Sequence, residues 1–303
     1  MYEVNRRRFL GLTASVAAAS LAQSLLTHEA FAVPSQLPPG IQLYAVREPL
    51  TADTRGTLQS LHKIGFREVE SAGFGRYSAT EFGRMIHDVG LRCPSAHLPF
   101  NTATDLGPLF ADAHALGAEY ATSSVLRMVS APGSNTPLPP LGLDGFQKAA
   151  ARMNEIGRAA KAAGLQYAYH NHNFEFERMP DGSFGYDLLL TQTDSSLVKF
   201  ELDCGWMISA GAKPTDYFTR YPGRFRMLHV KDFQPLLSPT IQLRGPGRPV
   251  GVELGRGFID YKPIFAAASS AGIEHAFAEQ EGPYLRPQLE SAKVSYNYLE
   301  SLR

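Results

Sequence analysis

LQYAYHNHNFEFE, residues 165–177, is a short apolar run that ends in two histidines, two asparagines and two glutamates. Gly164 precedes the run and is typical of the residue that closes a helix, so the stretch predicts a buried strand directly after a helix. Side chains alternate faces along a strand, which places Ala168, His170 and His172 on one side. Two imidazoles are therefore expected to point into one polar site. A surface loop with two hydrogen-bonded histidines is the alternative.

The same unit, in which a helix ends, a glycine follows and an apolar strand begins, recurs along the chain. Its instances are Ile64-Gly65-Phe66, Val89-Gly90-Leu91, Leu116-Gly117-Ala118, Ala163-Gly164-Leu165 and Ala271-Gly272-Ile273. The expected helix starts fit this pattern, because residues 78–81 form a capping box and Asp53 and Asp144 supply N-cap chemistry for the first and fourth helices.

Strands are predicted near residues 40–46, 66–70, 91–97, 118–125, 165–171, 198–203, 226–231 and 274–280, with helices in most of the intervals. Eight alternating strand and helix units predict a closed (β/α)8 TIM barrel, a single α/β domain over residues 33–303. An open doubly wound sheet is the alternative, but no glycine-rich dinucleotide fingerprint follows the first strand. Residues 131–142 and 233–257 are expected to form long loops at strand ends.

The first 32 residues are predicted to be a signal peptide rather than part of the fold. Arg6, Arg7 and Arg8 precede an apolar stretch over residues 12–26, and residues 30–32 suit a cleavage site. The pattern resembles a twin-arginine signal, so we expect the twin-arginine export machinery to deliver a periplasmic protein with no stable membrane insertion after cleavage. A retained anchor is the alternative, although the stretch is shorter than the roughly 20 residues of a span.

Composition and charge limit the classes of partner. The chain has 303 residues, 44% of them hydrophobic, and a formal net charge of +0, which indicates a globular protein with a sizeable core. The balanced charge gives no electrostatic case for a nucleic-acid or membrane-surface partner. Cys93 and Cys204 fall on separate strands on opposite sides of the predicted barrel, so we expect no disulfide.

Polar residues stand where the predicted strands end, which is the functional face of a parallel barrel. They include Glu70, His97, His170, His172, Glu201, Asp203, His229, Lys231, Glu279 and Glu281. Two histidines, an aspartate and a glutamate from strands five to eight offer nitrogen and oxygen ligands for one divalent metal ion such as manganese, zinc, cobalt or magnesium. These ligands are His170, Asp203, His229 and Glu279. A salt-bridged rim without a metal is the alternative.

From about Gly40 onward the chain resembles the xylose-isomerase-like TIM barrels known as sugar phosphate isomerases/epimerases, and among them an exported branch with a Tyr-His-Asn-His fifth strand. The matching pieces are residues 40–47, 169–172, 202–203, 229–232 and 278–280. The resemblance implies a small-molecule carbohydrate substrate. It also implies one metal held by a carboxylate on strand five and by Asp203, His229 and Glu279 on the next three strands.

The fifth strand departs from the epimerases of this family. His170 stands where they have a glutamate that is both a ligand and a proton-transfer base, and Glu175 and Glu177 follow as substitutes. The sequence therefore gives weaker support to an epimerisation in which two opposed bases transfer the proton. Inosose dehydratase, another relative, has a similar fifth strand, which makes elimination a competitor.

The chemistry of the family assigns roles to the remaining residues. Glu279 is expected to serve as ligand and base, Lys231 to steady a developing oxyanion, and His172 to take part in catalysis. Substrate binding is expected from a further set of residues at the same rim. This set is Glu70, His97, Glu175 and Trp206. Structural alternatives are an ion pair of Lys231 with Asp232 or Glu201, and of Glu70 with Arg47.

Three functions remain open at this stage. The first is a metal-dependent sugar isomerase or epimerase that abstracts a proton next to a carbonyl through an enediolate. The second is a lyase or dehydratase acting on a keto-sugar or keto-glycoside, and the third is a non-catalytic periplasmic sugar-binding barrel. The sugar, the metal and whether the chain forms a homo-oligomer are left open by the sequence.

Overall fold

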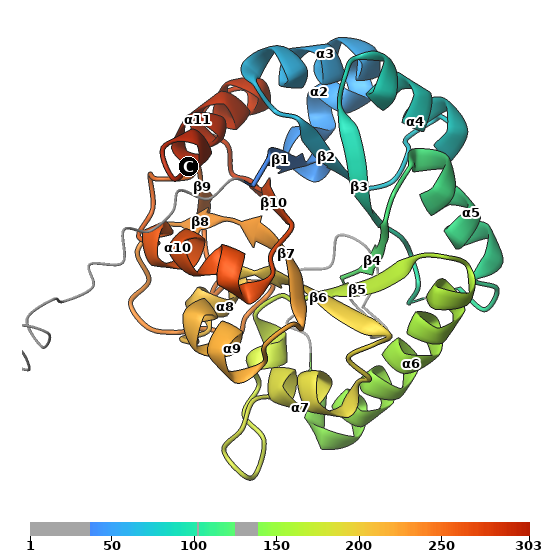
Figure 1. The fold of residues 1–303 in the computed structure, drawn as a ribbon. Helices are drawn as coiled ribbons and strands as arrows, with labels where there is room; N and C mark the ends of the chain where they lie inside the picture. The colour runs from blue at the N-terminus through green and yellow to red at the C-terminus, as the bar shows by residue number, and fades with distance from the viewer. Residues whose placement is uncertain (1–36, 102, 125–138) are drawn as a thin grey trace, which may run out of the picture. The chain divides into compact units, whose positions relative to one another are not determined.

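The computed structural model describes residues 37–101, 103–124 and 139–303 of the chain. Eight parallel strands close into a barrel in the order β1-β10-β7-β6-β5-β4-β3-β2, and the helices lie outside them (Figure 1). The predicted TIM barrel is therefore confirmed. The predicted signal peptide and most of the first predicted long loop lie outside the described residues.

The barrel strands agree with the predicted ranges to within a few residues. They are β1 (Pro39–Gln42), β2 (Glu68–Ser71), β3 (Arg92–His97), β4 (Tyr120–Ser123), β5 (Gln166–His170), β6 (Val198–Asp203), β7 (Phe225–Val230) and β10 (His275–Ala278). β1 ends earlier than predicted because the side-chain oxygen of Gln42 accepts a hydrogen bond from the backbone nitrogen of Tyr44 at 2.7 Å. This bond starts the 3-10 helix η1 (Leu43–Val46) in place of further strand.

Helices follow the strands in the predicted alternation. The longer ones are α3 (Thr54–Ile64), α4 (Ala79–Asp88), α5 (Gly107–Leu116), α6 (Gly142–Ala162), α7 (Gly185–Gln192), α10 (Lys262–Ala271) and α11 (Gln288–Glu300). Short ones are α2 (Arg47–Ala52), η2 (Phe174–Phe176), α8 (Cys204–Ser209) and α9 (Pro214–Arg220). Gly117 and Gly272 close α5 and α10 at φ 74° and 81°, in the left-handed region that glycine adopts freely.

Helix caps explain where the helices begin. The capping box of Ser78 and Glu81 is present at α4, and Asp53 accepts a hydrogen bond from Gly56 N at 3.0 Å at the start of α3. Asp144 does not cap α6, which begins at Gly142. Glu177 instead accepts hydrogen bonds from the backbone nitrogens of Leu141 (2.8 Å) and Gly142 (3.2 Å). Both carboxylate oxygens of Glu177 therefore bind backbone N–H groups at the start of α6. This role replaces the expected one, in which Glu177 substitutes for a metal ligand on strand five.

An apolar layer crosses the barrel interior. It consists of Tyr120, Ala168, Met227 and Phe277. On β10, Phe277 lies between His275 and Glu279, two residues away on either side and on the same face. His275 contacts the buried Glu68 through Nδ1 at 2.8 Å, so one carboxylate–imidazole pair lies on the side of this layer opposite to Glu279.

The second predicted loop is anchored by one carboxylate. β8 (Asp232–Phe233) and β9 (Gly251–Val252) form an antiparallel pair inside it. Asp232 accepts hydrogen bonds from Phe233 N, Gly255 N, Gly257 N and Ile259 N at 2.9–3.2 Å. Asp232 therefore holds this loop, and it is not the partner of Lys231 that the structural alternative named.

Two further expectations concern the whole chain. Cys93 and Cys204 are both buried and free, as predicted. Within the described ranges, no helix is both long enough and apolar enough to cross a membrane.

Candidate metal centre and active site

A cavity of about 570 Å³ opens at the carboxyl ends of the barrel strands. Its lining includes His97, His170, His172, His229 and Glu279, each from a strand exit or the residue that follows it. The interior face of the strands continues past the apolar layer into this cavity, since side chains on one face recur every second residue. Residues predicted from separate strands thus meet in one place.

The four predicted metal ligands lie together. His170, Asp203, His229 and Glu279 are buried, and one ligand atom from each lies within 4.8 Å of the others. Oδ2 of Asp203 is buried and has no hydrogen-bond partner among the described residues. It faces His170 Nε2 and His229 Nδ1, each at 3.9 Å. Lys231 Nζ lies 3.4 Å from this oxygen, which leaves it paired with a charge but without a hydrogen bond. A buried carboxylate oxygen in this state is costly, and a divalent ion would satisfy it, so these residues fit such an ion.

Local hydrogen bonds fix the direction of Asp203. Its Oδ1 accepts from Trp206 N at 2.8 Å and so caps α8, which leaves Oδ2 for the cavity side. Asn171 bonds both backbone groups of Asp203, accepting from its N at 3.1 Å and donating to its O at 3.3 Å. The asparagine of the Tyr-His-Asn-His strand therefore ties the end of β5 to the end of β6.

Lys231 is a buried cation surrounded by carboxylates, one of which is Glu279. Its Nζ lies 2.7 Å from Glu281 Oε1, 2.9 Å from Glu279 Oε2 and 3.4 Å from Asp203 Oδ2. Burial opposes the charged form of Lys231, but the surrounding carboxylates outweigh it and raise the pKa of the ammonium group. Burial likewise favours neutral Glu279, yet Lys231 and His229 hold the pKa of that carboxyl well below its usual range. Both groups are therefore ionised at neutral pH.

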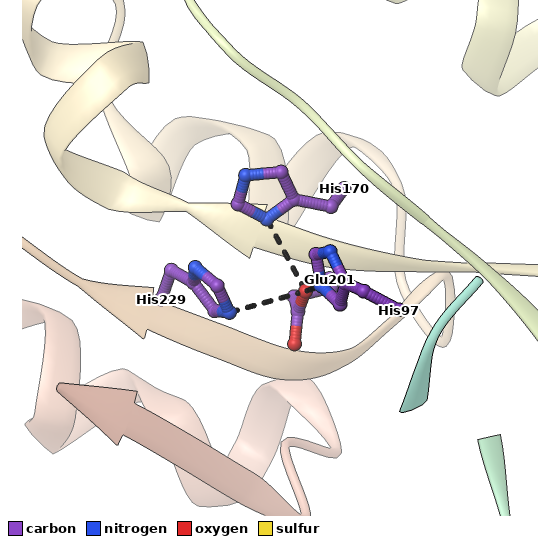
Figure 2. A group of neighbouring side chains, drawn as sticks. All are labelled: His97, His170, Glu201 and His229. Atoms are coloured by element: carbon purple, nitrogen blue, oxygen red, sulfur yellow. Dashed lines mark hydrogen bonds and ion pairs between the residues drawn. The ribbon is translucent and has the colours of Figure 1, made fainter. Parts of the chain in front are cut away.

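Glu201 stands at the centre of a second group that the sequence prediction left out. Figure 2 shows His97, His170 and His229 around this carboxylate, with nitrogens at 3.0, 3.2 and 3.3 Å from Oε2. Burial and the neighbouring Glu70 raise the pKa of Glu201 to about 7. The available signal was its place two residues before Asp203, on the same face of β6.

Glu70 lies below the cavity rather than on its wall. It is fully buried and contacts His229 Nε2 at 2.6 Å and His97 Nε2 at 3.1 Å. Arg47 is not its partner, because that guanidinium lies over the rings of Tyr44 and Tyr284 at 4.6 and 5.7 Å. Glu70 therefore contacts two histidines in this structure, and its expected contact with substrate stays a prediction.

Glu175 and Trp206 also differ from the expected substrate contacts. Glu175 is buried, with Oε1 accepting from Tyr169 OH at 2.7 Å and Oε2 from His172 N at 2.9 Å. Trp206 is 0% exposed, since the turn that Asp203 caps directs it inward, and Lys231 Nζ lies 4.8 Å from the centroid of its ring. The structure therefore assigns neither residue to the cavity wall.

His97 and His172 do reach the cavity, with opposite protonation. Burial disfavours charge on His97, but Glu70 and Glu201 outweigh it and raise its pKa to about 10. Burial and the charge of Lys231 lower the pKa of His172 to about 4. At neutral pH one ring is a cationic donor and the other a neutral imidazole.

Comparisons with known proteins agree with the fold. The inosose dehydratase of Lacticaseibacillus casei is 28% identical over 170 residues, which cover 52% of this chain and 55% of that protein. The chain spans about half the length of the curated relatives it matches.

Solved structures match over more of the chain. A sugar phosphate isomerase/epimerase from Parabacteroides distasonis ATCC 8503 is 25% identical with a TM-score of 0.68, covering 86% of this chain and 93% of that one. The IOLI protein, solved with a bound zinc atom, shares the fold at 12% identity and a TM-score of 0.64, covering 88% of this chain and 98% of that one. The model of one family extends over residues 58–302, and the chain belongs to this family, the xylose isomerase-like TIM barrels.

Proposed function

We propose that the protein is a divalent-metal-dependent enzyme that removes a proton next to the carbonyl of a keto-sugar and returns it elsewhere, as an isomerase or epimerase does. One observation carries the proposal. Four ligand residues from consecutive barrel strands converge beside a cavity of about 570 Å³, and Oδ2 of Asp203 faces them without a hydrogen-bond partner among the described residues. The cavity volume suits a small sugar, because ligand pockets commonly span about 300–1,000 Å³.

The ligand set defines what a metal would add. His170, Asp203, His229 and Glu279 would hold the ion. Once bound, it would act as a Lewis acid for the negative charge that develops on the substrate oxygen. All other steps fall to side chains of this chain.

Glu279 is the proposed base. It is ionised and lies in the cavity lining, where it takes the proton from the carbon next to the carbonyl. The electron pair of that carbon–hydrogen bond moves toward the carbonyl oxygen and forms an enediolate. The positive charge of Lys231, buried 2.9 Å from Glu279 and outside the cavity lining, stabilises the negative charge of this enediolate. Neutral His172 accepts a hydroxyl proton and returns it to the other oxygen. Glu279 then gives its proton to the neighbouring carbon, which completes an isomerisation without loss of atoms.

Hydrogen exchange tests the abstraction step. A keto-sugar incubated with the metal-loaded protein in deuterated water is expected to exchange the hydrogen next to its carbonyl, followed by NMR. Glu279→Gln should slow the exchange at least about a hundredfold, as for loss of a general base. Glu253→Gln is the matched control, because Glu253 is also a buried, ion-paired glutamate but binds Arg286 and Ser291 outside the cavity. Binding of the sugar without any exchange by the native protein would instead support a sugar-binding barrel.

Elimination is the second candidate. It is favoured by the 28% identity to inosose dehydratase and by His170 in place of a second carboxylate base on strand five. In this reaction the same abstraction is followed by departure of a hydroxyl or glycosidic oxygen, which leaves with a proton. Mass spectrometry separates the two outcomes, because isomerisation conserves the substrate mass and elimination lowers it by the leaving group.

A further inference from the structure

Two overlapping ligand groups share His170 and His229. The upper group adds Asp203 and Glu279, and the lower group adds His97 and Glu201. Each shared ring presents one nitrogen to each group. His170 directs Nε2 to Asp203 and Nδ1 to Glu201. His229 directs Nδ1 to Glu279 at 2.9 Å and Nε2 to Glu201 at 3.3 Å, and the same Nε2 lies 2.6 Å from Glu70, just outside the lower group.

The chemistry of imidazole decides between the groups. A neutral ring has one N–H and one lone pair, so it can bind an ion through only one nitrogen. Filling both groups at once would require two deprotonated rings in a buried site. One side of each shared ring must therefore carry a proton, and that side needs an acceptor.

The lower side supplies those acceptors. Glu70 Oε2 lies 2.6 Å from His229 Nε2. Glu201 Oε2 lies 3.2 Å from His170 Nδ1, a contact that Figure 2 shows. Glu70 is itself fixed, because its Oε2 accepts from Gln42 Nε2 at 3.2 Å and its Oε1 from Ser95 Oγ at 2.5 Å. On the upper side, Glu279 Oε2 lies 2.9 Å from His229 Nδ1, farther than Glu70 lies from Nε2, and the same oxygen also contacts Lys231 Nζ at 2.9 Å. Oδ2 of Asp203 is 3.9 Å from His170 Nε2 and makes no hydrogen bond with any described residue.

We propose that Glu70 and Glu201 are positioning residues that hold the N–H groups of His229 and His170, so that one metal ion binds at the upper group alone. His229 then binds through Nδ1 and His170 through Nε2. Carboxylates that accept from ligand histidines fix the tautomer and ring direction and raise ligand basicity. The proposal rests on the metal site of the proposed function, and its test does not depend on the reaction.

Zinc affinity and stoichiometry test the positioning role. The native protein is expected to bind one zinc ion per chain by elemental analysis. Glu70→Gln and Glu201→Gln are each expected to weaken binding about 10- to 100-fold by calorimetry, with stoichiometry unchanged.

Glu68→Gln provides the matched control. Glu68 lies on β2 two residues before Glu70 and contacts a buried histidine at 2.8 Å, but on the other side of the apolar layer. The zinc affinity of the Glu68→Gln variant should equal that of the native protein. Equal losses in all three variants, no loss in Glu70→Gln and Glu201→Gln, two ions per chain, or no zinc binding at all would each overturn the proposal.

A measurement on the native protein covers the case in which a variant does not fold. Long-range proton–nitrogen NMR spectra of the zinc-loaded chain, labelled at its histidines, distinguish the protonated from the metal-bound nitrogen of each ring. His229 is expected to be protonated at Nε2 and His170 at Nδ1. Zinc on either of these nitrogens would contradict the assignment even if the catalytic proposal survived, and loss of exchange activity alone would leave the assignment standing.

Discussion

His170 and Glu175 compete for the role of strand-five ligand, and their surroundings separate them. His170 ends β5 within the convergent ligand group, whereas both oxygens of Glu175 accept hydrogen bonds from Tyr169 and His172. His170→Ala is therefore expected to lose bound metal by elemental analysis. Glu175→Gln should keep it and lower the free energy of unfolding by about 1–3 kcal/mol, because a buried acceptor is weakened. Metal loss in Glu175→Gln alone would restore the two-carboxylate reading.

The pKa of His97 predicts how the stability of the metal-free protein changes with pH. Folding raises this pKa from about 6.5 in an unfolded chain to about 10, since Glu70 and Glu201 outweigh burial. The stabilisation of the folded state by protonated His97 is therefore fully present below about pH 6.5 and is lost as pH rises toward about 10. Denaturant titrations should show that the difference in stability between the native protein and His97→Gln shrinks over this range. A difference that grows with pH would show that the ring is neutral in the folded protein.

At the residue scale, sequence periodicity predicted which side chains share a face of a strand. It did not predict which of them are buried and which reach the cavity. Counting by twos along the strands identified four residues that converge in one group able to hold a metal ion. It could not identify Trp206 as buried, because that depends on the turn that Asp203 caps. Nor could it place Glu70 beneath the histidines, since this depends on contacts across the barrel between β2, β3 and β7.

At the scale of elements, the conformation of the loop after β7 depends on the side chain of Asp232. Asp232 accepts four backbone N–H groups that hold β8, β9 and the return toward α10. Asp232→Asn replaces one acceptor oxygen by a donor facing N–H groups, and we expect a loss of about 2–4 kcal/mol in the free energy of unfolding. Asp260→Asn is the control, because exposed Asp260 accepts, among the described residues, from Lys262 N alone, at 3.0 Å. Equal unfolding midpoints for the two variants would contradict this account.

Element boundaries were predictable where local chemistry sets them. The capping box at α4 and the glycine stops were read correctly from adjacent residues. The start of α6 was not, because its N–H acceptor is Glu177, far along the chain and beyond β5. The early end of β1 had a local cause in the side chain of Gln42, which strand propensity alone does not register.

For the whole molecule, the alternation of strands and helices was enough to predict the closed barrel, because parallel strands with covering helices have few other solutions at this length. The reaction could not be predicted in the same way, since relatives with this fold carry isomerase/epimerase and dehydratase names.

We further propose that the chain is exported to the periplasm by its first 32 residues. Replacing Arg6 and Arg7 by lysine is expected to leave precursor in the cytoplasm, followed by cell fractionation and immunoblotting. Arg8→Lys is the control, because it keeps the arginine pair. Normal delivery of the double variant would refute the export proposal.

The apolar layer of Tyr120, Ala168, Met227 and Phe277 bounds the polar interior of the barrel on the side opposite to the cavity opening. On the side of Glu68 and His275, these four side chains place an apolar layer between that ion pair and the cavity. Under the proposed function, protons and sugar would then share the opening at the carboxyl ends of the strands. If the proposed sugar fills this opening, part of the hydrogen removed by Glu279 should return to the same molecule, so exchange with deuterated water is expected to be slower than turnover of the sugar.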